Sequence, residues 1–425
     1  MTSTPSHPVA ARNWASNLTY AAATVVAPRS LDELAEVVRT SARVKALGSR
    51  HCFNTIADTD GVHILSSELP AEISIDPGRR IVRASAGLRY GDLAPVLHRE
   101  RWALANLASL PHISLAGAVA TGTHGSGDAV TSLAAAVAGL ELLTADGELL
   151  TVRRGDPGFE GFVVSLGALG IVTALELDIV PAFEVAQTVY ERLPLEAVLD
   201  DLDAVTGLGY SVSMFHTWRE PDVVDQLWVK RRADAVGALP DEVLGAAKAA
   251  VTRHPLPDVS AESCTDQLGA PGPWFARLPH FKLEFTPSNG DELQSEFLVP
   301  RRHAVAAIRE LRGLAGAVAP LLQVCELRTV AGDDLWLSPA YGTDVLGLHF
   351  TWRPDQPGVE RLLPAIESAL EPLGARPHWG KLFTLDGAAE RMPRLYPRWN
   401  DFGALRRRLD PRGVFGNGFL ARLGL

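Results

Sequence analysis

Two residues of opposite charge, Glu326 and Arg328, stand two positions apart in the segment LLQVCELRTV, residues 321–330. The apolar residues around them predict a strand, and residues two apart on a strand point to the same face. On a half-buried strand such a pair can be a structural ion pair. It can equally face a cleft, where a carboxylate and a guanidinium would position a polar substrate. The pattern alone leaves both interpretations open.

A second candidate is Lys381, the last residue of the segment HWGK at 378–381. In isolation this segment reads as a surface turn. A lysine held near Arg328, however, would have its pKa lowered by the like charge and by burial. It could then accept a proton from a hydroxyl group, which makes Lys381 a candidate general base.

His51 lies in the polar loop GSRHCFN, residues 48–54, and Ser109 lies in a longer uncharged segment. A histidine in such a loop is either a hydrogen-bonded turn residue or a nitrogen nucleophile able to bond covalently to a cofactor. Metal binding would need further ligands at fixed spacing, and the sequence offers none nearby, so no metal site is predicted. Ser109 lacks a Gly-x-Ser-x-Gly elbow and is expected to form hydrogen bonds rather than to attack a substrate.

The uncharged segment runs from Trp102 to Gly127 and contains no Asp, Glu, Lys or Arg. Its Pro, His and Gly residues argue against a helix that spans a bilayer. Small residues allow backbone N–H groups to approach a phosphate or a heterocycle closely, so the segment is either a cofactor cradle or a core rich in small residues. The glycines at 122–127 follow the order G-x-x-G-x-G, which is not the Rossmann fingerprint. A nucleotide would therefore lie on loop N–H groups, such as those of 47–52 and 121–124.

The composition limits the classes of protein to consider. The 425 residues carry a net charge of −10, with 50 acidic against 40 basic residues and no extended basic run, which excludes a nucleic-acid scaffold. The three cysteines are far apart and odd in number, which argues against a disulfide framework or a zinc site. The N-terminal residues show no apolar signal sequence, so we expect a cytoplasmic protein without membrane association.

Hydrophobic patterns predict two units of structure. Up to residue 182 a capping box at Ser30 and Glu33 predicts a helix, and Asp146-Gly147 predicts a hairpin between 137–144 and 148–153. Other elements of this part are strands at 44–47, 80–86 and 167–181 and a helix at 90–99. Their order is not a regular βαβ series, so a doubly wound sheet is not favoured.

Residues 183–375 are expected to form an antiparallel sheet with helices on one face. The predicted helices are 195–205, 240–251, 303–314 and 359–370, the predicted strands are 210–216, 227–230, 281–285, 322–330 and 345–352, and 252–279 is a predicted long loop.

Several motifs, taken together and in order, resemble one family across nearly the whole chain. They are LGSRHCFN (47–54), ASLPHISLAGAVATGTHGSG (108–127), LGALGIVT (166–173), CELRTV (325–330), HFTW (349–352) and HWGK (378–381). The sequence resembles the vanillyl-alcohol-oxidase type of FAD-linked oxidase, and within it the branch that oxidises alditols. The resemblance implies an α+β fold, with a bipartite FAD-binding domain (PCMH-type) at 1–182 and 376–425. A substrate domain built on a large antiparallel sheet flanked by helices would lie between them, at 183–375.

The resemblance also assigns roles to residues. His51 would bind FAD covalently at the flavin 8α carbon, although the subgroup reads G-H-S-F where Arg50 and Cys52 flank the histidine here. The other expected FAD contacts are Ala46, Leu47, Gly48, Ser49, Arg50, Cys52, Ser109, Ser114, Gly117, Thr121, Gly122, Thr123, His124 and Val172. The expected substrate-binding residues are Ser109, Glu326, Arg328, Thr351 and Lys381, and the expected catalytic residues are Lys381, Arg328, Glu326 and Ser109.

The implied reaction is oxidation of the terminal hydroxyl of alditols such as xylitol, sorbitol or glycerol to the aldose, with O₂ reduced to H₂O₂, by a monomeric enzyme. Two alternatives stay open. An aldonolactone oxidase or dehydrogenase would share the fold and the HWxK pattern, and a non-catalytic flavin- or sugar-binding protein would share the cradle. The segment Glu326-x-Arg328 together with ASLPHIS favours the polyol branch.

Overall fold

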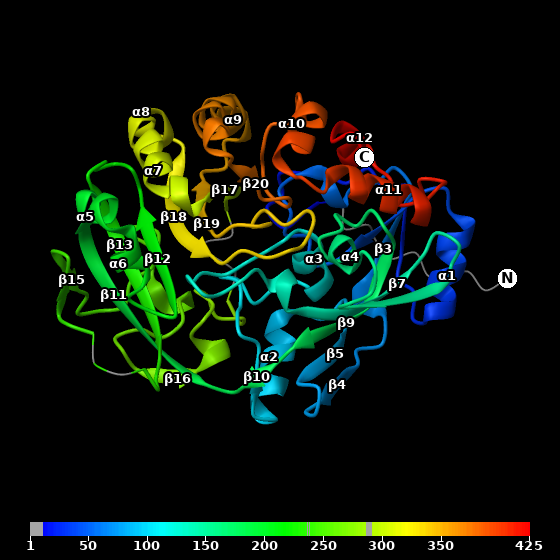
Figure 1. Cartoon of the computed structure of the whole chain (residues 1–425), viewed down its shortest axis with the longest axis horizontal. Helices are drawn as coiled ribbons and strands as arrows, with labels where there is room; N and C mark the ends of the chain where they lie inside the picture. The colour runs from blue at the N-terminus through cyan, green and yellow to red at the C-terminus, as the bar shows by residue number, and fades with distance from the viewer. Residues whose placement is uncertain (1–11, 236, 238, 286–290) are drawn as a thin grey trace.

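Two small sheets and the helices around them make up the N-terminal part of the protein (Figure 1). A computed structural model describes residues 12–235, 237, 239–285 and 291–425. One sheet has three parallel strands in the order β1–β3–β2, and the other has five antiparallel strands in the order β4–β5–β9–β7–β8. Their strands are β1 (Thr24–Val26), β2 (Val44–Leu47), β3 (Val62–Leu65), β4 (Ile73–Asp76), β5 (Ile81–Ser85), β7 (Val137–Leu143), β8 (Leu149–Arg153) and β9 (Ile171–Asp178). A short pair, β6 (Trp102–Ala103) and β10 (Val180–Pro181), lies beside them.

Local signals in this part are confirmed by the structure. The capping box starts α1 (Leu31–Thr40), where Ser30 Oγ accepts a hydrogen bond from the Glu33 N–H at 3.1 Å. The predicted helix at 90–99 is α2 (Tyr90–Arg99), and the Asp146-Gly147 turn joins β7 to β8. The helices α3 (Leu115–Ala120) and α4 (Phe159–Val163) complete this part.

A ten-stranded, antiparallel sheet dominates the second part. Its strands follow the order β14–β15–β11–β13–β12–β18–β19–β17–β20, and β16 pairs with β11. They are β11 (Glu184–Pro194), β12 (Ser211–His216), β13 (Val223–Arg232), β14 (Glu242–Val243), β15 (Ala246–Lys248), β16 (Pro271–Pro273), β17 (Leu293–Pro300), β18 (Leu322–Val330), β19 (Val345–Trp352) and β20 (Arg376–Pro377). Figure 1 shows the helices α7 (Ala304–Gly313), α8 (Ala315–Val318) and α9 (Gln356–Leu370) side by side on the outer face of this sheet. The antiparallel sheet with flanking helices is therefore confirmed.

Three local predictions in the second part are wrong. Residues 240–251 are not a helix but the hairpin β14–β15, because Leu244 and Gly245 both adopt positive φ and turn the chain back. Residues 281–285 form no strand, and only Phe281 makes an isolated bridge, to Cys264. The predicted helix at 195–205 breaks at Asp201 into α5 (Leu195–Asp200) and α6 (Leu202–Thr206), since the Asp201 side chain caps the second segment.

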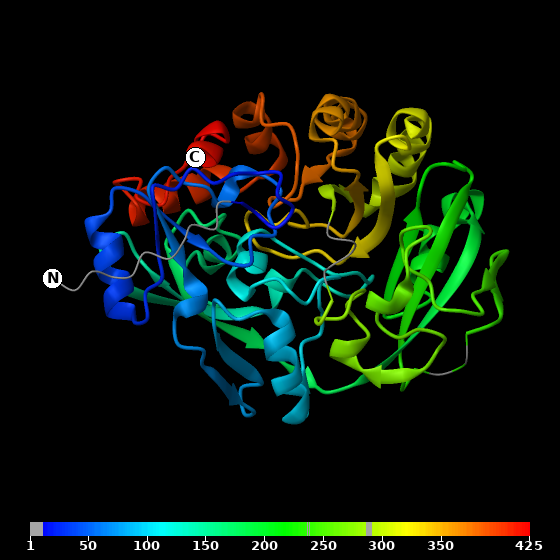
Figure 2. The same cartoon turned by 180° about the vertical axis from the view of Figure 1, so that it is seen from behind.

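The C-terminal segment returns to the N-terminal part and contains α10 (Ala388–Leu395), α11 (Trp399–Leu409) and α12 (Gly418–Arg422). Both Figure 1 and Figure 2 show α11 and α12 beside the N-terminal elements. The Val44 N–H donates to Val414 O at 2.9 Å, and Asn417 Nδ2 donates to Asp58 O at 2.8 Å. The domain boundaries at 182 and 375 stay predictions. Among the described residues, no helix is long and apolar enough to cross a membrane.

Candidate active site

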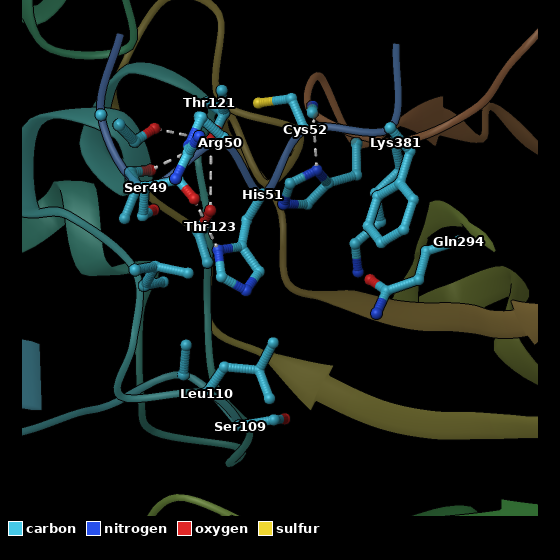
Figure 3. Close-up of a pocket in the computed structure, with 18 of the residues that line it drawn as sticks. Ser49, Arg50, His51, Cys52, Ser109, Leu110, Thr121, Thr123, Gln294 and Lys381 are labelled. Atoms are coloured by element: carbon cyan, nitrogen blue, oxygen red, sulfur yellow. Dashed lines mark hydrogen bonds between the residues drawn. The ribbon is translucent and has the colours of Figure 1, made fainter. Parts of the chain in front are cut away.

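A long cleft runs between the N-terminal part and the ten-stranded sheet. One wall consists of the loop after β2, the segment 108–124 and the turn 166–171. The other wall comes from β12, β17, β18 and β19, and from residues 378–381. Figure 3 shows the ring of His51 extending into this space, with Ser109 and Leu110 on one side and Gln294 and Lys381 on another. The cleft thus brings together segments that lie more than 300 residues apart in the sequence.

Most of the residues that the sequence singles out line this cleft. They are Ala46, Leu47, Gly48, Ser49, Arg50, His51, Cys52, Ser109, Ser114, Gly117, Thr121, Thr123, His124, Glu326, Arg328, Thr351 and Lys381. Gly122 and Val172 are not among the lining residues. Gly122 turns the chain at a positive φ of 66°, and Val172 pairs with Leu142 within the five-stranded sheet.

Close packing of small residues shapes the first wall. A Cβ atom on either Gly48 or Gly117 would crowd the Ser114 hydroxyl, so the loop after β2 lies directly on the start of α3. Ser49 Oγ accepts a hydrogen bond from the Ser114 N–H at 3.2 Å. Arg50 adopts a left-handed backbone conformation, with φ of 63°, which is unusual for a residue with a side chain. The two glycines therefore allow the loop and α3 to pack closely against each other along this wall.

His51 presents an unpaired nitrogen to the cleft. Its Nδ1 lies 3.2 Å from the carbonyl oxygen of Ser49, which can only accept, so Nδ1 carries the proton. The buried Nε2 has no hydrogen-bond partner among the described residues. Burial lowers the pKa of His51 to about 4, and the ring stacks on Trp14 at a centroid distance of 4.9 Å. The imidazole is therefore neutral near pH 7 and held with a free lone pair, as a nucleophile must be.

A buried carboxylate, Glu296 on β17, organises the second wall. Its Oε2 accepts a hydrogen bond from Lys381 Nζ at 2.6 Å, and its Oε1 accepts one from Arg328 Nη2 at 2.9 Å. His124 Nε2 lies 3.3 Å from Oε1. Burial alone would raise the pKa of Glu296, but Arg328 and Lys381 outweigh it and hold that pKa well below its usual range. Glu296 is thus an anionic anchor for two cations.

Lys381 contacts His349 as well as Glu296, since its Nζ lies 2.7 Å from His349 Nδ1. Burial lowers the pKa of Lys381, and the charge of Arg328 acts in the same direction while Glu296 opposes it. Burial together with Lys381 lowers the pKa of His349 to about 4, so this ring is neutral. The neutral amine form of Lys381 is therefore more accessible than that of an exposed lysine.

Glu326 and Arg328 do share one face of β18, as the spacing predicts. Glu326 Oε2 lies 3.4 Å from Arg328 Nη1, which also donates to Ser109 Oγ at 3.1 Å. Burial would raise the pKa of Glu326, yet Arg328 and His280 keep it well below its usual range. On the neighbouring strand, Thr351 Oγ1 lies 3.2 Å from His349 Nε2. The cleft therefore offers a carboxylate and two hydroxyls next to two cations.

Comparisons with known proteins identify the family. An FAD binding domain model matches residues 22–153, and a D-arabinono-1,4-lactone oxidase model matches residues 290–423. An alditol oxidase of Streptomyces sp. is 51% identical over 417 residues, covering 97% of this chain and 99% of that protein. The chain belongs to the vanillyl-alcohol-oxidase type of FAD-linked oxidases.

More distant relatives of this FAD-linked oxidase agree with the assignment. An L-gulono-1,4-lactone dehydrogenase of Mycobacterium tuberculosis is 30% identical, covering 97% of this chain and 98% of that protein. A solvent-stable cholesterol oxidase of known structure aligns with a TM-score of 0.79 at 16% identity, covering 97% of each chain. The last similarity shows the shared fold, and the expected FAD-binding domain is confirmed by the family model.

The first wall fits the FAD of this oxidase. Gly48 and Gly117 let its loop and α3 pack closely, and the residues of this wall, among them Ser114, Thr121 and Thr123, include no acidic side chain. A nucleotide diphosphate is best bound by such N–H and O–H donors. On this wall, His51 Nε2 supplies a buried lone pair that has no hydrogen-bond partner among the described residues.

Sequence patterns missed four side chains of the oxidase site: His349, His280 and His378, which line the cleft, and Glu296, which contacts Arg328 and Lys381 behind it. A signal for Glu296 exists, because Glu292, Gln294 and Glu296 alternate with apolar or small residues in DELQSEF. Polar residues two apart would share one face of a strand. His349 belongs to the motif HFTW but carried no predicted role.

Proposed function

We propose that this enzyme oxidises the terminal primary hydroxyl of alditols, such as xylitol or sorbitol, to the aldose and reduces O₂ to H₂O₂. The carrying observation is the second wall, opposite the His51 loop, where Glu326 lies 3.4 Å from Arg328 and the Glu296 carboxylate joins Arg328 to Lys381. The 51% identity to a Streptomyces alditol oxidase supports the same substrate class. Bound FAD would supply the hydride acceptor and pass the electrons to O₂.

The side chains of the second wall would have separate roles in substrate binding and proton transfer. Ser109, Glu326 and Thr351 are placed to hydrogen-bond the row of hydroxyls on a polyol. Arg328 and Lys381 would hold the reacting hydroxyl, and the neutral form of Lys381 would take its proton. Glu296 keeps both cations in place from behind, since it contacts each of them. Orientation of a flexible, hydroxylated chain is thereby achieved before the reaction.

A selectivity prediction follows from this division. Xylitol should exceed 1-pentanol in kcat/KM by roughly 10⁴-fold or more, because the unhydroxylated chain would leave buried polar groups unpaired. Peroxide formation measured with both alcohols checks this. Comparable kcat/KM values would contradict a site built to bind polyol hydroxyls.

The main alternative is an aldonolactone oxidase or dehydrogenase, favoured by the lactone oxidase model over 290–423 and by the 30% identity to a lactone dehydrogenase. Parallel assays with xylitol, sorbitol and L-gulono-1,4-lactone separate the two. We expect peroxide with the polyols at a higher kcat/KM than with the lactone. Turnover of the lactone alone would overturn the proposal, and lactone oxidation that needs a dye in place of O₂ would indicate a dehydrogenase.

We further propose that the His51 ring forms a covalent bond to the 8α carbon of the flavin. The neutral ring, the protonated Nδ1 and the free Nε2 support this linkage. Acid precipitation of the purified protein should give a yellow pellet, and the His51→Ala variant should give a colourless pellet. A colourless wild-type pellet with a yellow supernatant would exclude the covalent bond while leaving FAD binding intact.

The cytoplasmic location and the monomeric state expected from the sequence also remain proposals. Cell fractionation and size-exclusion chromatography with light scattering would test them.

A further inference from the structure

Behind the substrate-facing wall, a second chain of buried polar groups ends on Glu326. Lys230 on β13 places its Nζ 3.0 Å from His280 Nδ1, and His280 Nε2 lies 3.0 Å from Glu326 Oε1. All three side chains are buried. His280 lines the cleft beside Glu326, whereas Lys230 does not line it. Lys230 therefore reaches the site only through its neighbours.

We propose that Lys230 and His280 are positioning residues, which fix the His280 tautomer and so hold the Glu326 carboxylate in the orientation that binds substrate hydroxyls. This inference rests on the proposed polyol site. It concerns a role for two residues that the sequence did not single out.

The hydrogen bonds of Lys230 determine the tautomer. Its Nζ donates to Leu278 O at 2.5 Å and to Pro279 O at 3.3 Å, and its third contact is His280 Nδ1. Burial lowers the pKa of Lys230 to about 7, and below that pH its ammonium group has three donors and no acceptor, so Nδ1 must be the accepting nitrogen. The proton of the neutral imidazole is then on Nε2, where it donates to Glu326.

Packing prevents the His280 ring from turning away. Phe215 and Trp228 contact it edge-on, with centroid distances of 5.4 Å and 5.3 Å. The backbone N–H of His280 donates to the carbonyl oxygen of Ser109 at 3.0 Å, which joins this residue to the first wall. The ring is thus fixed in both orientation and position.

Burial and the nearby cations also keep the His280 ring neutral. Burial is the largest cause that lowers its pKa, to about 4, and Lys230 and Arg328 act in the same direction while Glu326 opposes them. Glu326 then has one oxygen held by a neutral donor and the other near the cation Arg328. Each carboxylate oxygen retains a lone pair that can accept a hydrogen bond from a polyol.

Two substitutions with matched partners test the proposal in the FAD-loaded enzyme. His280→Leu removes the donor to Glu326 and should raise KM for xylitol by about 5- to 150-fold, the range expected when a buried polar group loses its partner. His280→Gln keeps an N–H donor at that end and should stay within about threefold of wild type, as an order-of-magnitude expectation. Lys230→Met should raise KM by about tenfold with kcat nearly unchanged. Lys248→Met, which changes a partly exposed lysine of the same sheet, should leave KM unchanged.

The KM pattern would overturn the inference if His280→Gln were as impaired as His280→Leu, or if Lys230→Met kept the wild-type KM. A second readout is independent of turnover. Nitrogen-15 spectra of histidine-labelled protein, recorded below about pH 7, should show His280 as the neutral Nε2–H tautomer in the wild type. The Nδ1 signal should shift in Lys230→Met, because Nδ1 loses its hydrogen-bond donor there. If the wild-type enzyme shows the Nε2–H tautomer but oxidises no polyol, the proposed function is contradicted and the tautomer assignment is not. An Nδ1–H tautomer of His280 in the wild type would contradict the inference.

Discussion

Replacing Lys381 with methionine is expected to lower kcat for xylitol by about 10²- to 10⁴-fold, the range typical of a lost general base. The reason is geometric and electrostatic: Lys381 Nζ faces the cleft between Glu296 and His349, and burial lowers its pKa. The base must be neutral, so kcat of the wild type should rise with pH through the pKa of Lys381, below the ordinary lysine value. That dependence should be absent from the variant. Stopped-flow reduction of the flavin by xylitol measures the affected step.

Lys381→Arg is the matched variant for this prediction. Arginine keeps a cation beside Glu296 but stays protonated, because the pKa of a guanidinium lies far above the pH of the assay. It should therefore preserve folding and still lose kcat to a similar extent. If Lys381→Arg retained nearly wild-type kcat, Lys381 would act only as a positive charge, and the proton acceptor would have to be another group, with neutral His349 the nearest.

The largest expected loss of stability comes from Glu296→Leu, at about 3–5 kcal/mol in the free energy of unfolding, because it leaves two buried cations without their counter-charge. Both Arg328 and Lys381 depend on this carboxylate. Since the pKa of Glu296 is lowered in the folded protein, its stabilising effect is present above about pH 4.5 and is lost as the pH falls through the folded pKa. Urea unfolding of both proteins at neutral and acidic pH measures the difference.

Glu36→Gln is a suitable control, because Glu36 pairs with Arg39 on the exposed surface of α1. Its loss should change the free energy of unfolding by less than about 1 kcal/mol. Equal stability of Glu296→Leu and wild type would mean that Arg328 and Lys381 are accommodated at little cost without this carboxylate, and the anchoring role of Glu296 would be wrong.

Local sequence signals predicted those parts of the fold that depend on neighbours in the chain. The Ser30 cap, the Asp146-Gly147 turn and the β18 alternation each act within a few residues, and the structure has all three elements. The hairpin at 242–248 was mistaken for a helix, because its alanine-rich sequence has helical propensity. Pairing with β11 and the positive φ values at Leu244 and Gly245 override that propensity.

The candidate site could be predicted only in part for a related reason. Glu326 and Arg328 share a face by local geometry, but Glu296 reaches them through pairing of β17 and β18 on opposite edges of β19. Such long-range register leaves no local pattern. The alternation of Glu292, Gln294 and Glu296 is short and runs into the apolar residues of β17, which is buried on both faces, and the prediction places a strand at 281–285 instead. His280 is likewise brought to Glu326 by a loop whose course is set by tertiary contacts.

The most direct test of the account is to add xylitol to the yellow, FAD-loaded enzyme in the absence of oxygen and to follow its visible absorption. The proposed function predicts that the flavin colour bleaches, and that admitting air restores it once xylitol is consumed, with about one H₂O₂ formed for each xylitol oxidised, as a two-electron oxidation requires. Retention of the colour with xylitol and sorbitol, in a protein that L-gulono-1,4-lactone does bleach, would contradict alditol oxidation. Retention with all three would indicate a protein that binds flavin without catalysing this reaction.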